Sequence, residues 1–334
     1  MNILQRIQRL ISPVHHDAAI CPSADVDRLV DRILAELPLL LSIPGHRQKM
    51  TIPVSTALAF AGALADELGP PKRMEKSLWR RDPLFPLLFA TPQEGFDLFR
   101  ESHDLRATFA DQTVQECFFL LTMQRHEFEI LGSDLQGEMV LHGVLQTVLS
   151  FEHQRVTISA ASQTCIRAAV VEELVMHLAG VVPERLRRAE ELRRTLLESE
   201  TLLEAQQHTL ELTRKEVRTM DVSPTLRDQL RRARNELSRI DAQLAALPQP
   251  PEPETYLVQV CDVLMHPQDH IKTEMVTMHV EEFGIKSDRK EGKEISFLEL
   301  SSPDSRPLTL VLASLTRDTA RQIWPELKGH PIQS

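Results

Sequence analysis

The apolar positions of residues 226–244 recur in steps of four and three, which is typical of a helix that packs along another helix. An apolar row with a period of seven precedes it, from Val182 to Val217, accompanied by a weaker and more polar row. Ser223 and Pro224 then offer an N-cap and a first helical position for a new helix. Helices joined by so short a link must run antiparallel. We therefore predict an antiparallel coiled-coil hairpin at residues 183–247.

The interaction seam of this hairpin is the set of apolar residues expected to face the other helix: Leu196, Leu203, Leu210, Val217, Leu226, Leu230, Leu237, Ile240 and Leu244. The first helix also presents a polar row at Ser199, Gln206 and Thr213. When the apolar seam of the second helix packs against the partly polar first helix, part of its apolar surface stays uncovered. We expect a second copy of the hairpin to pack there as a four-helix bundle, so that the protein forms a dimer.

Residues 1–182 have mostly helical periodicity and form the predicted helical N-terminal domain. Clear helical patterns cover about 26–41, 54–68, 111–131 and 164–182. Prolines at 83, 86 and 92 break the segment between the second and third of these into turns and short helices. Its aromatic residues should form the centre of the domain: Trp79, Phe85, Phe89, Phe96 and Phe99. Residues 138–160 fit either a helix or a short strand.

Residues 248–254, PQPPEPE, read as a stiff proline-rich linker before a change of period. From 255 to 334 the apolar residues alternate, which predicts strands in YLVQVCDVLM, EMVTMHVEEF, EISFLELSS and LTLVLASL. A short helix capped at Thr316 should follow, although 268–283 could instead be helical. The predicted fold is mainly α and multidomain: a helical N-terminal domain, the coiled-coil hairpin and a small C-terminal α+β domain with an antiparallel sheet.

The net charge of −10 disfavours nucleic acid as a partner, because it repels phosphate unless a basic patch overrides it. The basic clusters of 184–247 are interleaved with glutamates, and ion pairs along a helix explain them. No apolar run is long enough for a membrane span, although residues 3–11 could form a peripheral amphipathic helix. Four scattered cysteines without CxxC spacing are typical of a cytoplasmic protein.

Catalytic and metal-binding motifs are largely missing from the sequence. Gly132 and Gly137 have P-loop spacing, but the lysine and hydroxyl that bind a nucleotide do not follow them. Four residues remain as polar site candidates: His103, His126, Glu138 and His142. For the pair His103 and Asp104, the simpler reading is that Asp104 caps the helix that follows. His126 lacks the second histidine four residues on that a zinc protease motif needs. Glu138 and His142 could begin a metal site, but a surface ion pair is the simpler reading because no third ligand is specified. We expect no metal and no cofactor.

These observations favour a cytoplasmic, non-catalytic interaction or assembly protein that uses the hairpin for oligomerisation or partner docking. Its expected partners are a second copy, another protein, or both. The alternative is an enzyme or small-ligand-binding protein with a site assembled in the helical domain, from residues distant in sequence, and dimerised by the hairpin. The sequence does not identify the biological process, the partner or the ligand.

Overall fold

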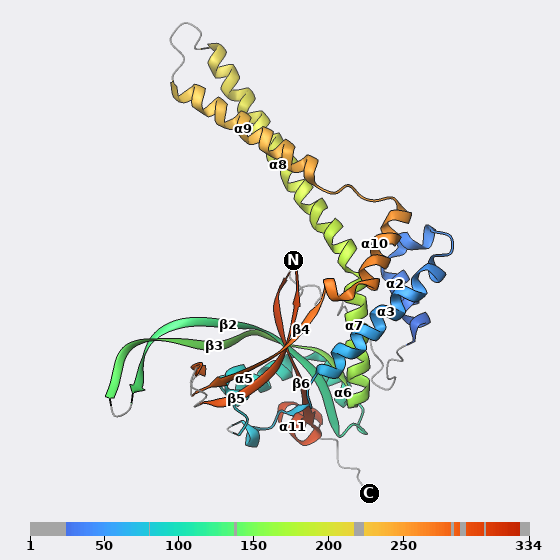
Figure 1. The fold of residues 1–334 in the computed structure, drawn as a ribbon, viewed down its shortest axis with the longest axis vertical. Helices are drawn as coiled ribbons and strands as arrows, with labels where there is room; N and C mark the ends of the chain where they lie inside the picture. Colours follow the sequence, from blue (N-terminus) through green and yellow to red (C-terminus); the bar gives the residue numbers. More distant parts are fainter. Residues whose placement is uncertain are drawn as a thin grey trace. The chain divides into compact units, whose positions relative to one another are not determined.

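A computed structural model describes residues 25–79, 81–136, 139–216, 224–281, 284–287, 292–303 and 305–327 (Figure 1). The chain divides into two compact units. Unit 1 comprises Met1–Glu36, Arg47–Leu178 and Val263–Ser334, and unit 2 comprises Leu37–His46 and Ala179–Asp262. Each unit is described by itself below.

A six-stranded sheet organises unit 1 (Figure 1). Its order is β3-β2-β6-β5-β4, all antiparallel, and the short β1 pairs in parallel with β6. The strands are β1 (Lys72–Arg73), β2 (Glu116–Gln136), β3 (Met139–Ala160), β4 (Lys272–Val280), β5 (Lys293–Ser302) and β6 (Ser305–Thr316). The sheet therefore combines strands from both sides of residues 183–247.

The predicted fold class is wrong because the N-terminal part is not wholly helical. Residues 116–136 and 139–160 form β2 and β3, where we expected a helix over 111–131 and left 138–160 open. In β2, Phe119 and Leu121 are buried on one face and Leu120 on the other. A strand buried on both faces has a continuous apolar run, which periodicity cannot distinguish from a buried helix.

The C-terminal strands do not form a sheet of their own either, because β6 pairs with β2 as well as with β5. Three of the four predicted strands are found as β4, β5 and β6, so Lys272–Val280 is a strand and not part of a helix over 268–283. The fourth, YLVQVCDVLM, is helix α10 (Pro253–Met265). The predicted terminal helix is confirmed as α11 (Arg317–Ile323), where the Thr316 hydroxyl accepts a hydrogen bond from the Thr319 amide.

Two strands that are not neighbours in the sheet, β3 and β5, contact each other through aromatic side chains. The rings of Phe151 on β3 and Phe297 on β5 meet edge to face with centroids 5.3 Å apart. Residues 284–287 connect the two outer strands, because Ile285 bridges to Val148 and Lys286 to Val280. Gly284 has φ +80° there, and a Cβ would lie 2.6 Å from the Leu149 carbonyl oxygen, so only glycine fits.

The aromatic centre predicted for the N-terminal domain is confirmed, and it lies in unit 1. It is built by α4 (Phe85–Leu88), α5 (Pro92–Glu101), α6 (His103–Ala110) and the 3-10 turn Lys76–Leu78, packed on the sheet. Linked ring contacts join these residues: Trp79, Phe85, Phe89, Phe96, Phe99 and Phe119. The Asp104 cap is wrong, because the Ser102 hydroxyl caps α6 by accepting a hydrogen bond from the Leu105 amide.

Three longer helices complete unit 1: α2 (Val26–Glu36), α3 (His46–Glu67, whose first residue belongs to unit 2) and α7 (Gln163–Ala179). Arg32 of α2 forms 2.6 Å ion pairs with Glu172 and Glu173 of α7. Burial by itself would lower the Arg32 pKa, but these two carboxylates raise it. Arg167 of α7 donates hydrogen bonds to the carbonyls of Ala65 and Leu68, at the end of α3. Short 3-10 turns lie at Pro267–Asp269 and Pro325–Leu327.

Unit 2 contains α8 (Val181–Glu216), α9 (Pro224–Ala246), the 3-10 helix Pro38–Ser42 and most of α10. Helices α8 and α9 lie side by side, and Arg234 of α9 pairs with Glu211 of α8 at 3.1 Å. However, the long coiled-coil hairpin that we predicted is not found. A coiled coil requires a continuous buried seam. Among the nine seam residues only Leu230 and Ile240 are buried, six are half-buried, and Val217 lies outside the described residues.

We expect Phe297→Ala to lower the free energy of unfolding by about 3–5 kcal/mol, because it leaves a cavity beside Phe151. Phe297 is 3% exposed, whereas Phe128 is 48% exposed, so Phe128→Ala is the matched control and should cost less than about 1 kcal/mol. Chemical denaturation measures both. Equal losses for the two variants would contradict this placement of the core.

Burial raises the pKa of the Cys117 thiol to about 12. We therefore expect Cys117 to stay protonated and unreactive toward iodoacetamide at neutral and mildly alkaline pH, because the thiolate is the reactive form. Peptide mass spectrometry after labelling measures this, with the denatured protein as the control. Labelling of native Cys117 as fast as in the denatured chain would refute its burial.

Candidate functional site

The candidate site is a two-stranded ribbon that extends from the sheet (Figure 1). β2 pairs with β6 from Glu116 to Met123 and with β3 from Phe118 onward, so beyond Met123 it pairs with β3 alone. In the same register Arg125 would face Pro307 of β6, which has no N–H to donate, so the β6 ladder ends there. We call residues 124–136 with 139–152 the β-ribbon. At ~3.3 Å per residue it is roughly 40 Å long.

A β-bulge marks the base of the β-ribbon. The β2–β3 register shifts between Thr122 and Gln124, opposite His153, whose φ is +57°. A bulge bends a strand and increases its twist, which directs the ribbon away from β6. The Gln154 side chain holds this bend by donating hydrogen bonds to the carbonyls of Leu88 on α4 and Phe151 on β3.

One edge of the β-ribbon has outward-facing backbone groups, and their positions follow from a single hydrogen bond. The Lys286 amide donates to the Thr147 carbonyl at 2.8 Å, so Thr147 faces away from β2. Thr147 is the register partner of Glu129. In an antiparallel pair, two residues opposite each other either both direct their N–H and C=O groups toward the other strand or both direct them away from it. The two arrangements alternate along each strand. The N–H and C=O groups of Glu127, Glu129 and Leu131 therefore point outward from β2, and no strand in the described part of the chain pairs with them.

The middle of the β-ribbon also exposes large apolar side chains on both faces. Phe128 and Ile130 lie on one face, exposed by 48% and 38%, and Leu131 and Leu145 lie opposite each other on the other, exposed by 75% and 59%. An isolated two-stranded hairpin is at best marginally stable in water. Exposed apolar groups of this size on such an element are typical of a contact surface.

Charged residues anchor the base of the β-ribbon to the sheet. Arg125 forms a two-point contact with Glu299 of β5, with Nε–Oε1 2.6 Å and Nη2–Oε2 3.2 Å. Arg125 also pairs with Glu127, which lies 3.6 Å from Lys286 Nζ. No ion pair reaches the Glu129 carboxylate within the described residues. The exposed middle of the ribbon therefore carries one uncompensated negative charge.

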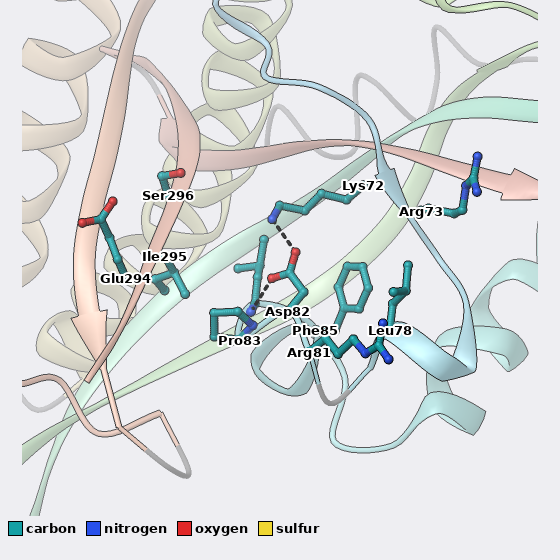
Figure 2. A pocket seen from close by; sticks show the side chains of 11 residues that line it. Lys72, Arg73, Leu78, Arg81, Asp82, Pro83, Phe85, Glu294, Ile295 and Ser296 are labelled. Carbon is teal, nitrogen blue, oxygen red and sulfur yellow. Dashed lines mark hydrogen bonds and ion pairs between the residues drawn. The ribbon is translucent and has the colours of Figure 1, made fainter. Parts of the chain in front are cut away.

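A pocket of about 390 Å³ lies between the segment that follows β1 and strand β5 (Figure 2). Lys72 and Asp82 point toward one another in it and form a 2.6 Å ion pair. The other Asp82 oxygen accepts a hydrogen bond from the Leu84 amide, so both carboxylate oxygens are used. The Arg73 guanidinium lies away from this pair. The pocket could admit a small molecule, but its central charges already neutralise each other.

The structure does not bring the four predicted polar candidates together. His103 is exposed at the start of α6. His126 lies at the base of the β-ribbon, with Nε2 3.5 Å from Glu152. His142 is exposed on β3, opposite Ser133, seven ladder positions from His126 and therefore roughly 23 Å away. Glu138 lies outside the described residues. Within the described residues no three His, Cys, Asp or Glu side chains gather as a metal site would require.

Sequence reasoning missed the β-ribbon as a site because it assigned residues 111–131 to a helix. The signal that could have found it is alternation in HEFEIL, where polar and apolar residues exchange at every step from His126 to Ile130. Of the helices in the described ranges, none is both long enough and apolar enough to cross a membrane. No protein-family model, curated protein or solved structure matches the chain.

We expect Arg125→Met to lower the free energy of unfolding by about 1–3 kcal/mol, because it leaves the buried Glu299 carboxylate without its charged donor. Arg231→Met is the control, since Arg231 forms an exposed ion pair with Asp228 and its loss should cost at most about 0.5 kcal/mol. Urea denaturation measures both. Equal stability of Arg125→Met and wild type would show that this contact does not anchor the ribbon.

Proposed function

We propose that the protein is a non-catalytic interaction protein whose contact surface is the β-ribbon. The observation that carries this proposal is the coincidence of an unpaired strand edge and exposed apolar side chains on one projecting element. Either feature alone is a liability for aggregation, and natural proteins usually cover it. A partner that pairs with the edge and covers Phe128, Ile130 and Leu131 would satisfy both.

The enzyme or small-ligand alternative has less support in the geometry. The polar candidates that it requires are spread over α6 and the two ends of the β-ribbon. The Lys72–Asp82 pocket is far from all of them in sequence, and its ion pair is self-contained.

The cellular location remains a prediction from the sequence. Scattered cysteines favour the cytoplasm, and Cys117 is a buried thiol. Cys165 on α7, however, is disulfide-bonded, which is uncommon in a reducing compartment. The interaction proposal does not depend on the compartment.

A photo-reactive amino acid placed at Leu131 or Leu145 tests the proposal in cells that express the protein. We expect irradiation to give a discrete higher-mass adduct from either position, because a partner covers these side chains. Ile52 on α3 is the matched control, since it is 69% exposed and lies away from the ribbon in the sequence.

The adduct should depend on the ribbon surface and not merely on exposure. It should disappear from the Leu131 position when Phe128 and Ile130 are both changed to Ser, while the protein remains folded by circular dichroism. Equal adducts from Leu131 and Ile52, or none from either ribbon position, would refute the proposed function.

A further inference from the structure

We propose that the outward edge of β2, from Glu127 to Leu131, binds an extended segment of another protein that carries a Lys or Arg between two apolar residues. The segment would add to the ribbon as a third, antiparallel strand. This inference rests on the proposed function and names the class of partner.

The backbone supplies the first part of the recognition. Glu127, Glu129 and Leu131 each direct an N–H and a C=O away from β3, as the Lys286–Thr147 hydrogen bond fixes. The register is uninterrupted from Gln124 to Gly132, so these groups are evenly spaced along one edge. An extended chain can pair with such an edge through main-chain hydrogen bonds whatever its sequence.

The side chains supply the second part, because the two faces of the edge strand differ. Phe128 and Ile130 present apolar surface on one face, and Glu129 presents a carboxylate on the other. The residue that pairs directly with Glu129 lies on the same face as its carboxylate, and the two flanking residues lie beside Phe128 and Ile130. A cation flanked by apolar residues matches all three positions.

The same charges argue against a second copy of this chain as the occupant. If two β2 edges paired antiparallel with Glu129 opposite Glu129 of the second copy, the two carboxylates would lie together. If Phe128 lay opposite Phe128 of the second copy, Glu129 of each copy would lie opposite Glu127 of the other. Like charges directly opposite each other destabilise a sheet. If Ile130 lay opposite Ile130 of the second copy, Glu129 would lie opposite Leu131, and its carboxylate would have no cation beside it.

The edge also lacks two of the usual protections against added strands. Neither β2 nor β3 contains a proline or a lysine, the residues that natural proteins place on exposed edges. The adjoining strand β6, by contrast, has Pro307 at the point where its own ladder with β2 stops. An added strand can therefore pair with the edge from Glu127 to Leu131, where the side chains favour a Lys or Arg between two apolar residues.

A synthetic peptide of alternating Val and Lys tests the proposal by isothermal titration calorimetry against the full-length protein. We expect it to bind and an alternating Val and Glu peptide not to bind. Glu129→Gln should weaken binding about threefold by removing the cross-strand charge pair. Glu129→Pro should weaken it about tenfold further, because it also removes an outward N–H.

These two variants are matched, since both lose the carboxylate and only the proline loses the donor. Glu129→Pro should still fold, because that N–H has no partner in the ribbon and edge strands tolerate proline at such positions. Glu129→Lys gives an independent check, since this variant should prefer the Val and Glu peptide to the Val and Lys peptide. Equal binding of both peptides by wild type, equal affinity of the Gln and Pro variants, or no exchange of preference would overturn the proposal.

A dimer of the wild-type protein in sedimentation velocity that Glu129→Pro converts to a monomer would also overturn it, in favour of a second copy at this edge. Photo-crosslinked adducts at Leu131 would persist if only the partner class were wrong. Their absence would instead refute the proposed function, so the two failures are distinguishable.

Discussion

The end of the β2–β6 ladder at Pro307 is the constraint on which the rest of the account depends. From Phe118 to Thr122, β2 is a central strand with a hydrogen-bonded neighbour on each side. Opposite Arg125 the neighbour would be a proline without a donor, and β6 continues with β5 alone. From that position onward β2 and β3 form a ribbon with an unpaired edge. A residue far away in sequence thus determines where the surface of the sheet becomes a projecting element.

A two-stranded ribbon needs support from the rest of the fold to persist in water, and three contacts provide it. The Arg125–Glu299 pair ties it to β5, the Gln154 amide fixes the bulge at His153, and residues 284–287 bridge the outer strands. The first two act at the base, and the third reaches Thr147 and Val148 on the outer edge of β3, behind the middle of the ribbon. The other edge of the ribbon, on β2 from Phe128 to Leu131, has exposed side chains and no neighbouring strand among the described residues.

Part of this fold was predictable from the sequence. Alternation predicted β4, β5 and β6, and proline positions with clustered rings predicted the aromatic centre. The helix assigned to 111–131 was wrong because Cys117 and Leu121 have helical spacing by coincidence in the part of β2 that is buried on both faces. The seam of α8 and α9 was predicted from period alone, and most of its leucines are only half-buried. The ribbon edge depends on the register between β2, β3 and β6, and such long-range pairing leaves no local signal in the chain.

Site-resolved amide hydrogen exchange of the β-ribbon by NMR tests the central claim most directly. If the edge of β2 is unpaired, the amides of Glu127, Glu129 and Leu131 exchange rapidly, while those of Phe128 and Ile130, which bond to β3, are protected. This alternation is the predicted result. Uniform protection from Glu127 to Leu131 would mean that another strand already occupies the edge, and uniform rapid exchange would mean that the ribbon does not form; either would contradict the account.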